Sequence, residues 1–171
     1  MLNRPTDRIH IQEVGMRDGL QSAGQFVETE DKVRLLNRLS KTGLSKIEVT
    51  SFVSPKAVPL LADAETVLSA IDRESEVVYT ALIPNLRGLD RALAVELDEV
   101  NVVMSVSEAH NMANLRMTCE DSLKQFHEMN EFRKCLMTRL KMPHALKFSP
   151  WYLPEHKSLW FGITISPILK I

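Results

Sequence analysis

The sequence is poor in the features that mark several common protein classes. Its 171 residues include only two cysteines, Cys119 and Cys135, whose spacing fits neither a disulfide scaffold nor a zinc site. No apolar run approaches the roughly 20 residues that a membrane helix needs. The first residues also lack the apolar segment of a signal peptide. We therefore expect a cytoplasmic protein without a membrane partner.

The sequence also lacks an excess of charge of either sign. The net charge is -1 at pH 7, with 25% charged and 44% hydrophobic residues, which is ordinary for a globular domain. Such a balance does not favour a nucleic acid as partner. The length predicts one domain with enough chain for a hydrophobic core.

What is present is a repeated unit of strand and helix. Short apolar segments that begin near residues 9, 46, 77 and 99 predict four strands, with helical periodicity after each of them. This alternation is typical of a parallel α/β sheet. A complete (β/α)8 barrel needs roughly 250 residues, so the chain would supply about half of one. A small, open, doubly wound sheet is the structural alternative.

Polar side chains follow the first two predicted strands, where parallel α/β folds bind their ligands. Arg17, Asp18 and Gln21 follow the first strand, and Ser51 ends the second. A guanidinium suits a carboxylate or an oxyanion, and a carboxylate suits a hard cation. An ordinary surface Arg-Asp pair beside a helix cap is the alternative interpretation.

Glu48 occupies the middle of the predicted second strand, between Ile47 and Val49. Burial of an unpaired carboxylate is costly, so we expect Glu48 to be paired or coordinated. An edge position that faces water is the alternative. His110, after the fourth strand, is either an acid-base group or a surface histidine.

Two motifs together carry a family resemblance. Residues 14–21, Val-Gly-Met-Arg-Asp-Gly-Leu-Gln, resemble the opening signature of the metal-dependent lyase and Claisen-condensation barrels. Residues 47–59, Ile-Glu-Val-Thr-Ser-Phe-Val-Ser-Pro-Lys-Ala-Val-Pro, are similar to the 3-hydroxy-3-methylglutaryl-CoA lyase family, as are residues 84–88 and 107–114. A third hypothesis, a condensing enzyme of the same superfamily, is disfavoured by residues 51–59. The resemblance covers about residues 9–127 and implies an α/β fold, a partial (β/α)8 TIM barrel of about four N-terminal βα units.

The resemblance also implies a reaction. Enzymes of that family cleave a 3-hydroxy-3-methylglutaryl-CoA-type acyl-CoA to acetyl-CoA and acetoacetate with a divalent metal, Mg²⁺ or Mn²⁺. Asp18 would be a metal ligand, and Arg17 would be catalytic by stabilising the enolate that develops on the thioester. Glu48, also at a catalytic position, would orient the groups around the metal and Arg17. Gln21 and Ser51 would contact the substrate.

Two further elements of the family pattern are missing. The family takes two more metal ligands from a His-x-His pair, whereas the histidines of this sequence are all widely separated, at positions 10, 110, 127, 144 and 156. The family's catalytic cysteine lies in a glycine-rich loop, and neither Cys119 nor Cys135 has glycine around it. The alternative to an active lyase is therefore a truncated, inactive remnant, at most a binding or association module.

The sequence changes character after about residue 127. We expect residues 1–127 to form the half barrel and 128–171 to be a tail outside the family, such as a shifted reading frame would produce. A genuinely evolved, divergent C-terminus is the alternative. Residues 159–165 could form a strand, but the sequence does not indicate its partner. A half barrel would leave a free edge on the fourth strand and would expose apolar side chains such as Val102 and Met104, although the tail or another chain could cover some of that surface. We therefore expect poor solubility or self-association.

Overall fold

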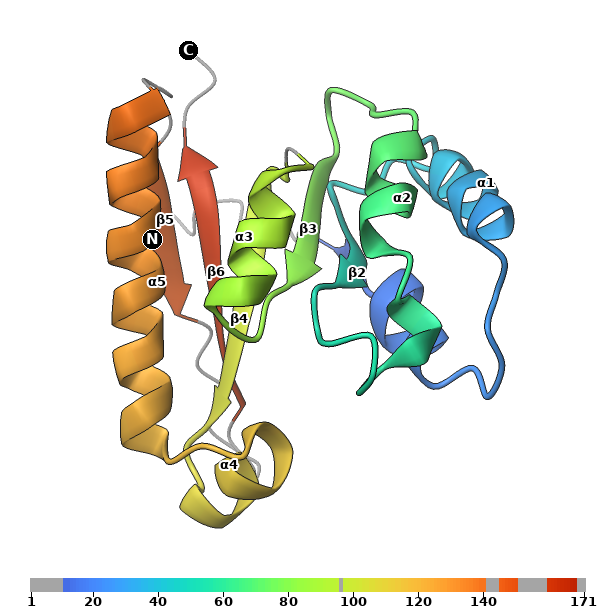
Figure 1. Ribbon diagram of the computed structural model, residues 1–171. Helices are drawn as coiled ribbons and strands as arrows, with labels where there is room; N and C mark the ends of the chain where they lie inside the picture. The colour runs from blue at the N-terminus through green and yellow to red at the C-terminus, as the bar shows by residue number, and fades with distance from the viewer. Residues whose placement is uncertain (1–10, 96, 141–144, 151–159, 169–171) are drawn as a thin grey trace, which may run out of the picture.

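The structure is a computed structural model that describes residues 11–95, 97–140, 145–150 and 160–168. Within these residues the strands form one six-stranded sheet in the order β1-β2-β3-β4-β6-β5 (Figure 1). The strands are β1 (Gln12–Glu13), β2 (Lys46–Ser51), β3 (Val78–Leu82), β4 (Glu99–Ser105), β5 (Ala145–Pro150) and β6 (Trp160–Ile168).

The first four strands are parallel, and each pairs with the next one along the chain. This confirms the predicted alternation of four strands with helices. The predicted starts of the later three strands agree with the structure to within a residue or so. The predicted start of the first strand, near residue 9, lies outside the described residues.

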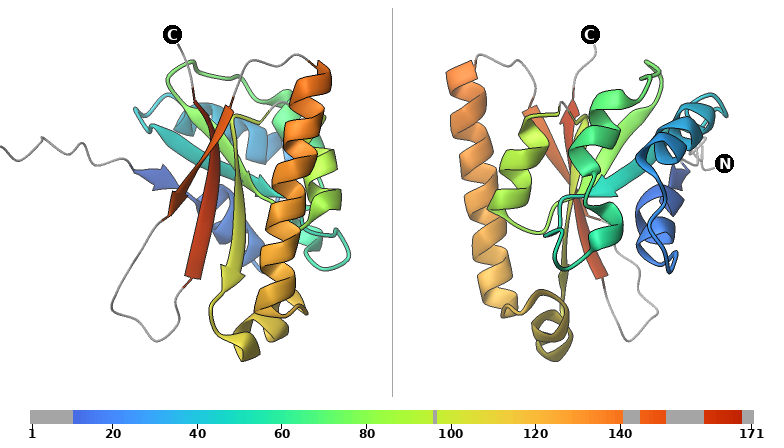
Figure 2. Two further views of the ribbon diagram at one scale, coloured as in Figure 1. Left: turned by 90° about the vertical axis from the view of Figure 1, so that its left-hand side faces the viewer. Right: turned by 45° about the vertical axis from the view of Figure 1, so that its right-hand side comes forward.

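The described helices are α1 (Thr29–Leu39), α2 (Ala64–Ala70), α3 (Leu86–Leu93), α4 (Glu108–Leu115) and α5 (Cys119–Leu140). Figures 1 and 2 show α2, α3 and α5 on one face of the sheet. Before α5, Asp121 N donates to Thr118 Oγ1 at 3.0 Å, and the Thr118 hydroxyl donates to Asp121 Oδ2 at 2.6 Å. Helix α4 was not predicted; its N-cap is Ser107, whose hydroxyl accepts a hydrogen bond from His110 N.

Alternate residues of the parallel strands separate into two sets, as the pleat of a strand requires. One set is apolar and belongs to the same buried cluster as side chains of α2, α3 and α5; it comprises Ile47, Val49, Tyr79, Ala81, Val100, Val102 and Met104. The intervening set is polar and is also buried; it comprises Glu48, Thr50, Thr80, Glu99, Asn101 and Ser105. The predicted exposure of Val102 and Met104 was therefore wrong, because both point into the helix-covered core.

The end of the chain covers the edge of β4. Strand β6 runs antiparallel to β4, from Val100 paired with Ile165 to Ser105 paired with Trp160, and β5 runs antiparallel to β6. The possible strand at 159–165 is confirmed from residue 160 onward, and its partner is β4; residue 159 lies outside the described residues. The edge that a bare half barrel would leave free on β4 is covered by β6, which is the alternative in which the tail covers that surface. The predicted boundary after residue 127 falls inside α5 and stays a prediction.

Candidate active site

The first candidate residues lie on a short π-helical turn, Gly15–Gly19, that follows β1 directly. Two amides, those of Arg17 and Asp18, donate to the same carbonyl of Val14 at 3.0 and 2.7 Å. Met16 is buried in the core and anchors the turn. The turn places Arg17 and Asp18 side by side directly after β1, and their side chains are joined by a hydrogen bond from Arg17 Nη1 to Asp18 Oδ1.

The Arg17 side chain reaches across to β2. Its Nε donates to Oε2 of Glu48 at 2.7 Å, and the Glu48 side chain is only 2% exposed. The prediction that Glu48 is paired is thereby confirmed, and the alternative of a water-facing edge position is excluded. Arg17 itself is 20% exposed, so the guanidinium connects a buried carboxylate to the surface.

Asn101 of β4 completes the environment of the buried carboxylate. Its Nδ2 donates to Oε1 of Glu48 at 2.6 Å. Both carboxylate oxygens of Glu48 therefore accept a hydrogen bond, one from a charged donor and one from a neutral donor. Our sequence reasoning missed Asn101, although an asparagine within the apolar run of residues 100–104 is itself an unusual signal.

Asp18 points outward from the same turn. Its Oδ1 accepts a hydrogen bond from Arg17 Nη1 at 2.8 Å, while its side chain remains 65% exposed. An exposed carboxylate of this kind can supply one oxygen ligand to a divalent cation. In the described part of the chain, however, no group of three His, Cys, Asp or Glu side chains could hold a metal ion. These residues therefore fit one ligand position and not a complete metal site.

The two predicted substrate contacts differ in accessibility. Gln21 is exposed just after the π-helical turn. Ser51 is buried at the end of β2, where its Oγ accepts a hydrogen bond from Val53 N at 3.2 Å. This bond shapes the turn after β2. Their roles toward a substrate stay predictions.

Polar residues after β4 make hydrogen bonds that hold α4 and α5 in place. The buried side chain of Asn111 accepts from Ser105 N at 2.9 Å and donates to Ser122 Oγ at 2.7 Å. The carboxylate of Glu108, which accepts a hydrogen bond from Cys119 N at 3.0 Å, raises the pKa of the Cys119 thiol, because a negative acceptor beside the thiol favours its protonated form. The thiol itself donates to the carbonyl of Ser105 at 3.1 Å. A thiol held in its protonated form is a poor nucleophile.

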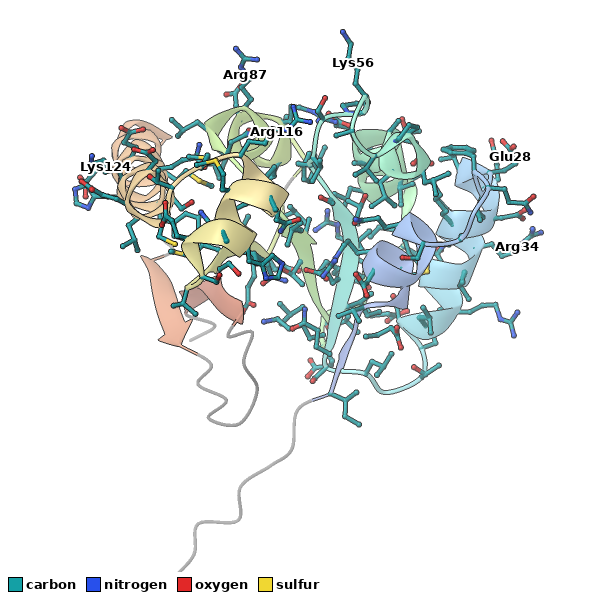
Figure 3. The ribbon with its side chains drawn as sticks, turned by 90° about the horizontal axis from the view of Figure 1, so that it is seen from below. Glu28, Arg34, Lys56, Arg87, Arg116 and Lys124 are labelled. Atoms are coloured by element: carbon teal, nitrogen blue, oxygen red, sulfur yellow. The ribbon has the colours of Figure 1, made fainter. Side chains whose placement is uncertain are left out.

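Figure 3 looks from below onto the end of the sheet toward which the β3 and β4 arrowheads of Figure 1 point. The basic side chains Lys56 and Arg87 project away from the sheet on the helix side of this view. Arg17 and Asp18 follow β1 at the carboxyl-terminal end of the parallel strands, which is where such sheets bind ligands.

Comparison of this chain with known proteins identifies a family and several relatives. The HMGL-like family model matches residues 8–151. A hydroxymethylglutaryl-CoA lyase of Bacillus subtilis is 49% identical over 123 residues, which are 72% of this chain and 41% of that protein. The mitochondrial hydroxymethylglutaryl-CoA lyase of Gallus gallus is 43% identical over 122 residues, 71% of this chain and 41% of its own length. The chain thus spans about two fifths of the length of these relatives.

Solved structures give the same result. The HMG-CoA lyase from Bacillus subtilis superposes with a TM-score of 0.73 at 46% identity, over 75% of this chain and 43% of that one. An HMG-CoA lyase from Acinetobacter baumannii, in complex with coenzyme A and 3-methylmalate, superposes with a TM-score of 0.70 at 48% identity, over 71% and 40%. The likeness confirms the predicted α/β fold as a partial TIM barrel.

Proposed function

The chain belongs to the HMGL-like family, and on that basis we propose that Arg17, Asp18 and Glu48 form one side of the active site of a hydroxymethylglutaryl-CoA lyase-like carbon-carbon lyase. The substrate would be an acyl-CoA of the 3-hydroxy-3-methylglutaryl-CoA type, and the products would be acetyl-CoA and acetoacetate. The observation that carries the proposal is the Arg17-Glu48 ion pair, formed between the two motifs that resemble this family.

The proposed reaction breaks one carbon-carbon bond. The tertiary hydroxyl on C3 loses its proton, and its oxygen becomes the ketone oxygen of acetoacetate as the C2–C3 bond breaks. The electron pair of that bond moves onto the thioester and forms an enolate. A proton then adds to C2 and gives acetyl-CoA, so atoms and charge balance without an oxidant or reductant.

Arg17 is suited to the negative charge that develops on the thioester oxygen. Glu48 Oε2 holds its Nε and Asp18 Oδ1 holds its Nη1, which fixes the plane of the guanidinium before a substrate arrives. Among the described residues no hydrogen bond occupies its Nη2. A donor that is already oriented needs little reorganisation as charge develops, and such donors are a large catalytic term.

The proposal includes a divalent metal, Mg²⁺ or Mn²⁺, for which Asp18 would supply one carboxylate ligand. When bound, such an ion holds substrate oxygens and makes the tertiary hydroxyl easier to deprotonate. The described residues alone do not complete its coordination.

A second candidate function follows from the missing ligands. The 171 residues contain no His-x-His, and Asp18 is the one predicted metal ligand in them. We propose as the alternative that this chain by itself binds an acyl-CoA or associates with a partner without turnover. The relative from Acinetobacter baumannii that was solved with coenzyme A is consistent with acyl-CoA as the ligand class.

A coupled assay for acetyl-CoA release from 3-hydroxy-3-methylglutaryl-CoA, with added Mg²⁺, separates the two candidates. Turnover that falls at least about a hundredfold in Arg17→Gln and in Asp18→Asn would support the lyase. Arg34→Gln, on the exposed face of α1, is the matched control. Binding without turnover supports the alternative. Turnover that both site variants leave unchanged would overturn the proposed site.

We further propose the cytoplasm as the location and no nucleic acid as partner. Named relatives include a cytoplasmic enzyme of Homo sapiens and a mitochondrial one of Gallus gallus. Among the described residues, none of the helices combines the length and apolarity needed to cross a bilayer. Cell fractionation with an antibody against this chain tests the location.

A further inference from the structure

Glu48 is the most deeply buried charged group of the candidate site, and Asn101 is its one neutral partner among the hydrogen bonds described. The two residues lie 53 positions apart, on β2 and β4, with β3 between them in the sheet. Asn101 is 8% exposed. The bond therefore ties the carboxylate to a strand that is not adjacent to β2 in the sheet.

Each carboxylate oxygen of Glu48 accepts a hydrogen bond from a different residue. Asn101 Nδ2 occupies Oε1 at 2.6 Å, which leaves Oε2 to Arg17 Nε at 2.7 Å. A carboxylate bound at one oxygen only can rotate about its terminal bond, because that torsion is broad. With the second oxygen held, the position of Oε2 is fixed, and the plane of the Arg17 guanidinium is fixed with it.

We propose that Asn101 is a positioning residue, which acts through Glu48 to hold Arg17 in the orientation that the site uses. Asn101 itself would not touch the substrate. The part of this inference that concerns the substrate rests on the proposed function. The part that concerns the order of Arg17 does not, so the two can fail separately.

The neighbouring Thr80 shows that burial on this side of the sheet is not sufficient for such a role. Thr80 of β3 pairs in register with Glu48, and its side chain is completely buried. Within the part of the chain that the structure describes, its hydroxyl nevertheless has no hydrogen-bond partner. Thr80→Val therefore preserves shape and removes no bond to Glu48, which makes it the matched control for substitutions of Asn101.

The Nε–H of Arg17 is a direct spectroscopic reporter of the proposed role. We expect a resolved ¹H–¹⁵N signal from this group in the full chain, assigned by its loss in Arg17→Lys. Asn101→Leu, which keeps the approximate volume, should accelerate the hydrogen exchange of this Nε–H about tenfold, as expected for weakening one charge-assisted hydrogen bond. Thr80→Val should leave the exchange rate unchanged.

Asn101→Ala is the second variant, in case the leucine disturbs the strand, and circular dichroism checks that each variant is folded. Faster Nε–H exchange in a folded Asn101 variant, with none in Thr80→Val, supports the proposal. An unchanged exchange rate of the Arg17 Nε–H in every folded Asn101 variant would overturn it. Equal acceleration in Thr80→Val would also overturn it, since the effect would then be general loosening of the sheet. None of these outcomes requires acyl-CoA cleavage.

Discussion

Lys32 of α1 and Asp63 at the start of α2 form an ion pair in which Nζ lies 2.7 Å from Oδ1. Asp63 occupies the N-cap position of α2, but its side chain makes no capping hydrogen bond. Its second oxygen instead accepts from Thr29 Oγ1 at 2.7 Å. These contacts therefore join the first turn of α1 to the start of α2, at the end of the segment that connects β2 to α2.

Removal of this charge should destabilise the fold. Lys32 is 3% exposed, and its Nζ also donates to the carbonyl of Leu60 at 2.8 Å. Lys32→Met would leave Asp63 partly buried without its cation, which costs about 3 kcal/mol of unfolding free energy. Urea unfolding measures this loss, and Lys41→Met, at an exposed position of the same region, is the control. Equal stability of the two variants would show that the pair contributes nothing.

The ion pair between Glu65 of α2 and Arg91 of α3 should make stability depend on pH. The pKa of Glu65 is lowered, chiefly by the hydrogen bond from Arg91, from its ordinary value of 4.5. Its ionised form is therefore favoured by folding, so the stabilisation is present above that ordinary value and is lost as pH falls below it.

Glu65→Gln tests this pH dependence. We expect a loss of about 0.5 kcal/mol at pH 7, since the pair is partly exposed, and almost no difference from the unsubstituted chain near pH 3. Urea unfolding at the two pH values provides the comparison. Glu128→Gln, at an exposed position of α5, is the control and should change the unfolding free energy equally at the two pH values. If the loss of unfolding free energy in Glu65→Gln were larger at pH 3 than at pH 7, the predicted direction of the pH dependence would be contradicted.

Gly88 should be intolerant of a side chain. A Cβ at this position of α3 would lie 2.9 Å from the carbonyl oxygen of Phe52 and 3.2 Å from Cδ of Pro84. Gly88→Ala must push α3 away from the end of β2, at a cost of about 2 kcal/mol in unfolding free energy. Gly19→Ala, where a Cβ would meet nothing within 4 Å, should stay within about 0.5 kcal/mol. Chemical denaturation measures the unfolding free energy of both variants. A larger loss in Gly19→Ala than in Gly88→Ala would contradict the close approach of Gly88 to the Phe52 carbonyl.

Strand β6 should limit the self-association predicted from the sequence. A chain that ends after residue 150 loses β6, which leaves the edge of β4 without its antiparallel partner. Free strand edges pair with other chains, so we expect this shortened chain to form larger species than the full chain. Light scattering after gel filtration measures their mass, and a chain that ends after residue 168 is the control. Identical masses for all three would exclude a protective role for β6.

Most of the parallel sheet could be predicted from the sequence, because short apolar segments and helical periodicity are local signals. The pairing of Glu48 could be predicted as well, since the cost of burying a lone carboxylate is independent of the fold. The partner Asn101 could not, because a bond across 53 residues depends on strand order and on the facing of β4. Helix α4 was missed because its N-cap signal lies in a stretch of polar residues.

The sequence by itself determined the family motifs, the four parallel strands and the need of Glu48 for a partner. Only the tertiary structure decided which partners Glu48 and Asp63 have, and which face Val102 and Met104 occupy. It also decided that β6 covers the edge of β4. The physical reason is that these outcomes depend on contacts between distant segments, and a one-residue change in strand facing would exchange the polar and apolar sets. Local patterns specify the elements, and packing specifies which of their faces meet.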